Sequence, residues 1–95
     1  MFEIKNELLK PIISACGEKA QKIQTIEELS ELTKALCKSI KNDTMDVRES
    51  VTEEMADVII MVSQMVIVYD NGADIKKIIN DKIERTYKRL GLEAQ

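Results

Sequence analysis

Two pairs of acidic residues have a spacing that suits the binding of a divalent cation. Glu28 and Glu31 form one pair, and Glu54 and Asp57 form the other. Each pair has i, i+3 spacing inside an apolar helical pattern, which places both carboxylates on one side of a helix, one turn apart. Like charges at that spacing repel each other and lower helix stability. Two such pairs facing each other would form a set of oxygen ligands suited to Mg²⁺ or Mn²⁺.

The elements that carry these residues are predicted to be helices, because the apolar periodicity indicates four helical segments. They run from about Glu3 to Cys16, over at least Ile26 to Lys41 with a start as early as Glu18, from between Asp46 and Ser50 to Asp70, and from Asp74 to about Leu90. No segment alternates with period two, so no strand is expected. We therefore predict a single all-α domain over residues 1–95, folded as a four-helix bundle.

Local residue types define the expected helix ends. Gly17 and Gly91 stand where helix C-caps are expected, and residues 42–44 form a polar stretch typical of a loop. Ser50 begins a sequence that fits a capping box for the third helix. Asp74 is the N-cap expected for the fourth helix.

Positions on a helical wheel place the two acidic pairs on equivalent flanks of their helices. The first pair falls on one flank of an apolar stripe, beside Ala35, and that stripe consists of Ile26, Leu29, Leu32, Leu36 and Ile40. The second pair falls on the corresponding flank of the third helix. If these two helices pack antiparallel in a bundle, the pairs can meet near one end, and small residues such as Ala35 and Ala56 allow close approach.

The third helix is apolar nearly all round after Asp57, over residues 58–62 and 65–68. A helix of that kind must be covered on every side. Three short neighbours in a chain of 95 residues can hardly provide the cover. We therefore expect a homodimer or homotetramer in which this helix packs against its symmetry mate.

The last helix offers basic residues for an anionic ligand. Lys82 lies inside the apolar stripe of that helix, with Arg89 close by and Arg85 on its flank. A lysine in an apolar stripe either extends its ammonium group to solvent or faces an anionic site. Lysine, arginine and a metal ion around one pocket are what polyphosphate binding requires. Lys34 either adds positive charge to such a site or pairs with Glu31 on its own helix.

Composition and charge exclude several classes of protein. The net charge is −3 and no basic block is present, so nothing indicates binding to duplex nucleic acid. The most apolar run, residues 58–69, contains 12 residues and is too short to span a bilayer, so no membrane partner is expected. Cys16 and Cys37 lack metal-type spacing and are expected to be buried thiols in a reducing cytoplasm.

Other interpretations of the acidic residues remain open. Thr25 to Glu28 also fits a capping box, in which Glu28 would only cap a helix, and the other acids could be ordinary solvated charges. The absence of histidine excludes a ferritin-like di-iron site and disfavours zinc hydrolysis. A protein of another class, a non-catalytic helical dimer acting as an adaptor or regulatory subunit, would share the apolar third helix.

The acidic residues also resemble the signature of a known family. Glu27-Glu28-x-x-Glu31, followed after 22 residues by Glu54-x-x-Asp57, is similar to the EExxE…ExxD pattern of the MazG-like all-α nucleotide pyrophosphohydrolases. The resemblance covers about residues 21–89. It implies a helical bundle assembled as a dimer or tetramer. It also implies Mg²⁺-dependent hydrolysis of a nucleoside triphosphate to the monophosphate and pyrophosphate, with Mn²⁺ as a possible alternative.

The resemblance implies roles for individual residues. The metal ligands are Glu28, Glu31, Glu54 and Asp57. Glu27 matches an acid that could orient or activate water, and Lys82 and Arg85 match the phosphate-contacting region of the last helix. The residues expected to bind substrate are Lys34, Asn80 and Arg89. The chain carries Thr86 where some members have Asn, and the preferred base and sugar stay open among relatives such as dUTP-directed hydrolases and phosphoribosyl-ATP pyrophosphohydrolases.

Overall fold

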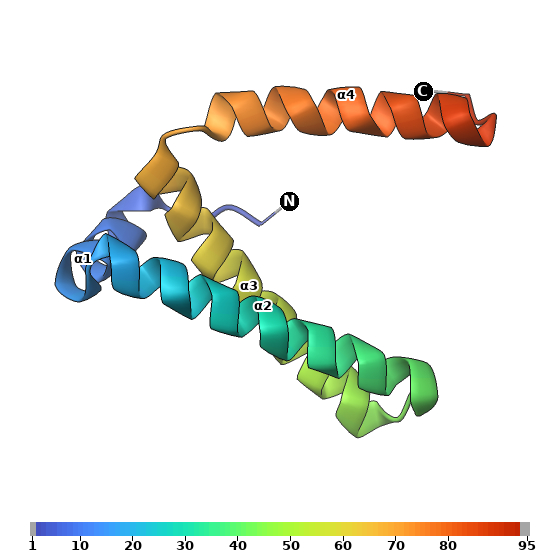
Figure 1. Cartoon of the computed structure of the whole chain (residues 1–95), viewed down its shortest axis with the longest axis horizontal. Coiled ribbons are helices and arrows are strands. Elements are labelled where there is room, and N and C mark those ends of the chain that lie inside the picture. Colours follow the sequence, from blue (N-terminus) through green and yellow to red (C-terminus); the bar gives the residue numbers. More distant parts are fainter. Residues whose placement is uncertain (1, 94–95) are drawn as a thin grey trace.

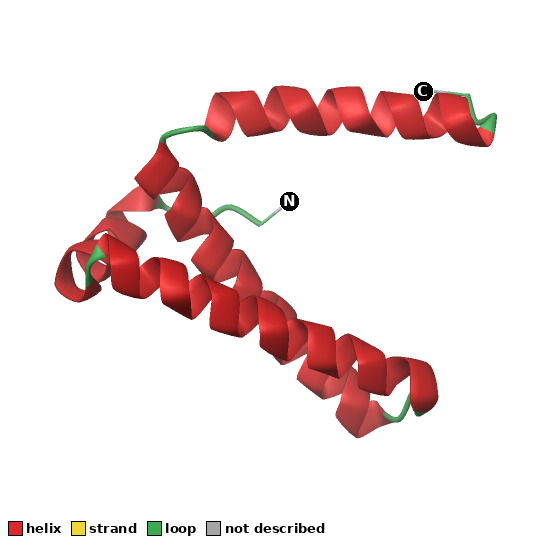
Figure 2. Cartoon of the chain, in the orientation of Figure 1, coloured by secondary structure: helices red, strands yellow, loops and turns green. Residues whose placement is uncertain are grey.

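The computed structural model describes residues 2–93, and every regular element in that range is an α-helix (Figures 1 and 2). The helices are α1 (Asn6–Cys16), α2 (Glu18–Lys41), α3 (Met45–Tyr69) and α4 (Gly72–Leu90). The prediction of an all-α protein with four helices is confirmed. The second helix has the early start that the sequence allowed.

The helix ends depend on single residues. Gly17, with a φ of 92°, separates α1 from α2, and Gly91, with a φ of 70°, ends α4, so both predicted C-caps are confirmed. Asp70 ends α3 in the left-handed conformation, with a φ of 49° and a ψ of 48°. Asp70 and Asn71 are the whole connection between α3 and α4.

Three helix starts differ from the prediction. The helix α1 begins at Asn6 rather than at about Glu3. The helix α3 begins at Met45, because Thr44 already caps it: the Thr44 Oγ1 atom accepts a hydrogen bond from the Val47 N–H at 3.3 Å. The capping box predicted at Ser50 therefore lies inside the helix. The helix α4 begins at Gly72 after Asn71, so Asp74 lies in its first turn rather than at the N-cap.

The helices α2 and α3 form a long antiparallel hairpin, and α1 packs across both near the open end (Figure 1). Residues 42–44 join the two long helices, and beside this loop Arg48 donates two hydrogen bonds to the Asp43 carboxylate, at 3.0 and 2.7 Å. At the other end of the hairpin the Lys22 ammonium group lies 5.0 Å from the centre of the Tyr69 ring. A charged side chain thus makes a surface contact at each end of the hairpin.

The face that α2 turns toward α3 is mainly polar or small. The residues on it recur at alternating spacings of four and three, as in an antiparallel coiled coil, and all are buried or half-buried: Gln21, Thr25, Glu28, Leu32, Ala35 and Ser39. From α3, Met61 and Gln64 are the fully buried residues. We call this contact the α2–α3 seam. It buries little apolar surface for helices of this length.

The apolar stripe of α2 points away from α3. Ile26 is 66% exposed and Ile40 is 85% exposed, and Leu29 and Leu36 are exposed as well, so only Leu32 of the stripe is half-buried. Several apolar residues of α3 are also exposed, including Met55, Ile60 and Val62. The prediction that both cysteines are buried is wrong for the single chain, because Cys16 and Cys37 are exposed.

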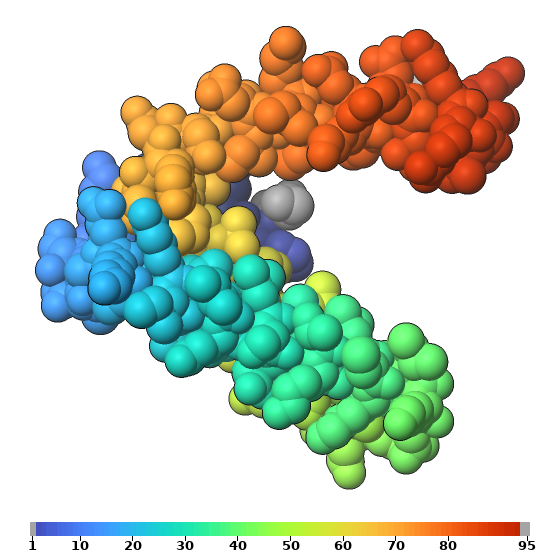
Figure 3. Space-filling view, in the orientation of Figure 1, coloured from blue at the N-terminus to red at the C-terminus, as the bar shows by residue number. Residues whose placement is uncertain are grey.

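The helix α4 extends away from the rest of the chain and buries none of its residues (Figure 3). The radius of gyration is 16.2 Å, against about 12 Å for a compact chain of this length. The accessible surface is 7834 Å², whereas a compact monomer of this mass would expose about 5,500 Å². The single chain is therefore an open arrangement with a large uncovered surface.

Within residues 2–93, no helix is long and apolar enough to cross a membrane.

Candidate metal centre

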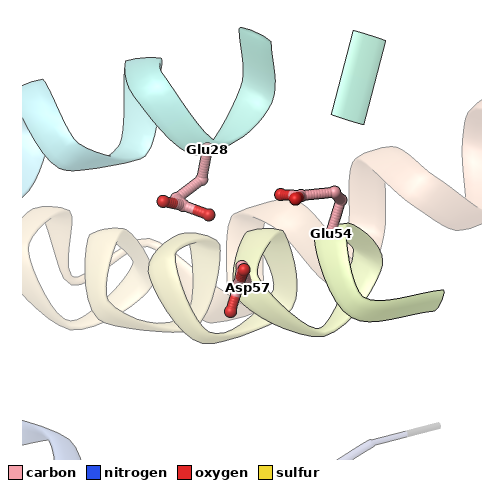
Figure 4. A group of neighbouring side chains, drawn as sticks. All are labelled: Glu28, Glu54 and Asp57. Atoms are coloured by element: carbon pink, nitrogen blue, oxygen red, sulfur yellow. The ribbon is translucent and has the colours of Figure 1, made fainter. Parts of the chain in front are cut away.

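Three of the four predicted metal ligands come together in the α2–α3 seam. Glu28 from α2 and Glu54 and Asp57 from α3 each offer one carboxylate oxygen atom, and these three atoms lie within 4.8 Å of one another. Figure 4 shows Glu28 and Glu54 extending toward each other across the gap between the helices, with Asp57 one turn further along α3. All three residues are half-buried. We call them the carboxylate cluster.

The local sequence explains why these side chains meet. Glu54 and Asp57 stand one turn apart on α3, and Glu28 lies on the face of α2 that forms the seam. Glu28 is ten residues into α2, which begins at Glu18, so it cannot cap that helix. Thr25 has no capping role either, because its hydroxyl donates a hydrogen bond to the Gln21 carbonyl oxygen at 2.7 Å. The capping interpretation of Glu28 is therefore wrong.

The cluster makes Glu28 a weaker acid. Partial desolvation is the main cause that raises the pKa of Glu28, and repulsion from the Asp57 carboxylate adds to it. The Gln24 side chain opposes the shift, because its Nε2 atom donates a hydrogen bond to Glu28 Oε1 at 2.8 Å. Gln24 thereby also holds one Glu28 oxygen in a fixed direction.

Glu54 responds to the same neighbours. Partial desolvation raises the pKa of Glu54, followed by repulsion from Asp57, Glu28, Glu31 and, least of these, the adjacent Glu53. Glu31 thus lies near enough for its charge to act on Glu54 and Glu28, although it is exposed and its oxygen atoms do not belong to the carboxylate cluster. Negative charge accumulates here without any basic residue among the causes of either pKa shift. A cation would relieve that repulsion.

The donor set fits Mg²⁺ or Mn²⁺. These ions prefer carboxylate oxygen atoms, and Mg²⁺ holds them at about 2.1 Å, so ligands on opposite sides of the ion lie about 4.2 Å apart. The three oxygen atoms lie within 4.8 Å of one another, and side-chain rotations that bring them closer would let all three contact one octahedral ion, whose neighbouring ligands lie about 3.0 Å apart. Three protein ligands also leave coordination positions for water and for substrate oxygen atoms.

The remaining predicted site residues are not gathered at the cluster in the single chain. Glu27 and Lys34 are exposed on α2, and the Glu27 carbonyl oxygen accepts a hydrogen bond from the Ser30 hydroxyl at 2.7 Å. Asn80 is exposed on α4. A shallow depression on α4 of about 550 Å³ contains the three other basic candidates, and its lining is Lys82, Arg85, Thr86, Lys88 and Arg89.

Sequence reasoning missed three glutamines near the cluster. Gln24 contacts Glu28 directly, as described above. Gln21 and Gln64 form a buried hydrogen bond across the seam, from Gln21 Nε2 to Gln64 Oε1 at 2.7 Å. One signal was available: Gln21 precedes Glu28 by seven residues and Gln64 follows Asp57 by seven, which places each glutamine on the same helix face as an acid.

Comparison of the chain with protein-family models, with curated proteins and with solved structures gave no match in any of the three. The class that fold and site define is therefore an all-α protein with a cluster of three carboxylates between two helices. The resemblance to the MazG-like enzymes stays a proposal that depends on the residues of this chain.

Proposed function

We propose that this protein is a Mg²⁺-dependent nucleotide pyrophosphohydrolase that converts a nucleoside or deoxynucleoside triphosphate to the monophosphate and pyrophosphate. The observation that supports the proposal is the convergence of Glu28, Glu54 and Asp57 from two helices on one point. A bound divalent cation would supply positive charge that draws the triphosphate to this acidic surface and polarises its phosphorus–oxygen bonds.

The chain's own residues have the following roles in the proposal. Glu28, Glu54 and Asp57 would hold the cation, with Glu31 as the fourth proposed ligand. Glu27, next to Glu28 and open to solvent, orients the attacking water and accepts its proton. Lys82 and Arg85 offset the charge that develops on the leaving pyrophosphate. Lys34, Asn80 and Arg89 contact the substrate.

The proposal requires a second copy of the chain, because α4 carries most of the basic candidates and stands apart from the cluster of its own chain. The single chain exposes roughly 2,300 Å² more surface than a compact monomer of its mass would. An obligate homodimer buries about 2,000–5,000 Å² in total, which is about 1,000–2,500 Å² from each copy. A partner that covers the exposed stripe of α2 and the apolar residues of α4 would bury a comparable area.

Charge complementarity also favours a second copy as the occupant. The helix α4 contains six basic and three acidic residues, whereas α3 contains five acidic residues and one basic residue. The α4 of one copy can therefore lie beside the carboxylate cluster of another with opposite charges facing each other. We propose a homodimer or homotetramer in which each site combines the cluster of one copy with α4 of its neighbour.

The experiment that tests the function is pyrophosphate release from a panel of NTPs and dNTPs, with Mg²⁺ and with EDTA. The wild type is compared with Asp57→Asn, which removes a cluster ligand. Glu53→Gln is the matched control, because Glu53 neighbours the cluster in sequence, is exposed and lies outside it. We expect metal-dependent release by the wild type and by the control, and a loss of at least about 100-fold in the Asp57 variant.

No release of pyrophosphate from any nucleotide by a folded wild type would contradict the proposal. In that case the exposed apolar stripe of α2 would favour the non-catalytic adaptor or regulatory subunit. The same assay ranks the substrates, which the residues of the site do not identify.

A further inference from the structure

The α2–α3 seam contains a buried polar contact that the proposed chemistry does not use. Gln64 is 2% exposed and Gln21 is 7% exposed, and the amide of Gln21 donates to the Gln64 oxygen across the seam. The Gln64 Nε2 atom lies 3.7 Å from Met61 Sδ. Both amides are removed from water, so each depends on the other for a strong hydrogen-bond partner.

A competing packing of the same two helices would bury more apolar surface. On α2, Leu29 and Leu36 lie about 80–100° around the helix from Glu28, and in the observed packing both are exposed. Turning α2 by that amount would bring its apolar stripe against α3. The hydrophobic effect favours such a turn, yet it would carry Glu28 away from Glu54 and Asp57.

The Gln21–Gln64 hydrogen bond opposes that turn. Gln21 shares its helix face with Glu28, and Gln64 shares its helix face with Asp57, because each pair is seven residues apart. If α2 turned, Gln21 would leave the seam together with Glu28, and the buried amide of Gln64 would lose its partner. Buried polar pairs of this kind are known to select one packing of paired helices over others.

We propose that Gln21 and Gln64 are positioning residues that select the face that α2 presents to α3, and that they thereby place Glu28 in the carboxylate cluster. The metal-binding part of this inference rests on the proposed function, whereas the choice of helix face does not. The hydrogen bond also keeps the apolar stripe of α2 outward, where a second copy can cover it.

The test replaces both glutamines by methionine, which has a similar shape but no amide. Two properties are measured: the Kd for Mn²⁺ by electron paramagnetic resonance, and the distance between spin labels on Cys37 of α2 and on a cysteine at Thr52 of α3. Cys16→Ser removes the other thiol in all proteins, and dilution with unlabelled protein suppresses distances between copies. The matched control is Thr25→Val, because Thr25 is buried in the same seam but bonds only within its own helix.

We expect the double variant to stay helical, its Kd for Mn²⁺ to rise at least tenfold and its label distance to shift or split into two populations. The Thr25 control should match the wild type in both measurements. An unchanged label distance in the double variant would overturn the choice of helix face. A shifted distance with an unchanged Kd would overturn the positioning of Glu28.

Further measurements apply if the double variant does not fold or if the wild type binds no Mn²⁺. If the double variant does not fold, Gln21→Met alone is measured in the same way, since Gln64 then keeps its contact with Met61, and the same shifts decide the question. If the wild type binds no Mn²⁺, the proposed function fails, whereas the label distance still decides whether the two glutamines select the helix face.

Discussion

The α2–α3 hairpin and α4 differ in where their polar and apolar residues lie. On α2, polar and small residues form most of the inner contact and the aliphatic stripe faces outward, whereas most apolar residues in the second half of α3 are half-buried. The helix α4 has an ordinary amphipathic pattern, with Ile78, Ile79 and Ile83 along one face, but no neighbour covers that face in the single chain. The hairpin therefore has the groups for holding a cation, and α4 has the apolar and basic groups for binding to another surface.

Under the proposed function, this difference would divide the parts of one site between two paired helices and a helix that stands apart. The carboxylate cluster needs two helices held in one orientation, and the Gln21–Gln64 hydrogen bond crosses the seam between them. In the proposed assembly the basic residues need only to reach a phosphate group, and a separate helix from a neighbouring copy would supply them. The predictions below test this division, beginning with the largest expected effect.

The strongest test separates the two regions by complementation. Asp57→Asn on α3 should lower kcat/KM and abolish Mn²⁺ binding. The double variant Lys82→Ala/Arg85→Ala should lower kcat/KM by about 10²–10³-fold and leave Mn²⁺ binding unchanged. Mixed and co-refolded, the two inactive proteins should recover part of the wild-type activity, because some sites then combine an intact cluster with an intact α4.

Activity is measured as pyrophosphate release and metal affinity by Mn²⁺ titration. A mixture that recovers no activity, although subunit exchange is shown by mass, would contradict the contribution of α4 from a second copy. Loss of Mn²⁺ binding in the α4 variant would contradict the division itself.

The second test concerns the outward stripe of α2. Glutamate at both Ile26 and Leu36 should disrupt the assembly, because two charges would have to be buried against the partner. We expect the dissociation constant of the oligomer to rise by at least about 100-fold, measured by sedimentation velocity over a range of concentrations. Ser30→Glu adds a charge to an exposed position of the same helix and should leave the mass unchanged. If the double variant keeps its wild-type mass, the stripe is not the interface.

The third test uses pH on the metal-free protein. The pKa values of Glu28 and Glu54 are raised above their ordinary value of 4.5. At pH values between 4.5 and the raised pKa values, the folded state therefore binds more protons than the unfolded state. The metal-free protein therefore becomes more stable as the pH falls through the raised pKa values, and this added stability is lost as the pH rises through them.

In EDTA, we expect Tm, measured by circular dichroism, to increase by a few degrees as the pH is lowered from 7 to 5. Saturating Mg²⁺ should remove most of this dependence, because the ion offsets the repulsion between the carboxylates at neutral pH. The double variant Glu28→Gln/Glu54→Gln should show a flat profile with or without the metal. A profile of the wild type that falls toward pH 5 would contradict the assignment.

The smallest effect is expected at the loop that joins α2 and α3. The hydrogen bonds from Arg48 hold the pKa of Asp43 below its ordinary value of 3.8, so the stability that this pair adds is present at neutral pH and is lost as the pH falls through the lowered pKa. Both side chains are largely exposed to water. Asp43→Asn should therefore lower Tm at pH 7 by no more than about 3 °C and leave Mn²⁺ binding unchanged.

Much of the fold could be predicted from the sequence, because it depends on local signals. The number of helices, the ends at Lys41 and Leu90 and the meeting of Glu28 with Glu54 and Asp57 follow from periodicity, glycine positions and i, i+3 spacing. The start of α3 was missed because a weaker capping sequence at Ser50 competes with Thr44. The orientation of α2 was not predictable from apolar pattern alone, since the stripe from Ile26 to Ile40 marks the outer face.

The candidate site was predicted in part for the same physical reason. Acids on neighbouring turns of one helix are visible in the sequence, and so is their equivalent placement on two helices. The position of Glu31 outside the cluster depends on how far each helix is turned, which a hydrogen bond between Gln21 and Gln64 fixes across 43 positions of the chain. The separation of α4 from the hairpin is not visible in the sequence, because an amphipathic pattern does not say which surface covers a helix.

The connection at Asp70 and Asn71 has a consequence for how such a protein can evolve. The connection has two residues, one of them in the left-handed conformation. In the proposed assembly they would set whether α4 folds back on its own hairpin or reaches a neighbour. Short connections of this kind favour the exchange of elements between copies. Under the proposed function, inserting a few flexible residues there would let α4 reach the carboxylate cluster of its own chain. A small insertion would then convert an assembly whose copies depend on one another into a self-contained monomer.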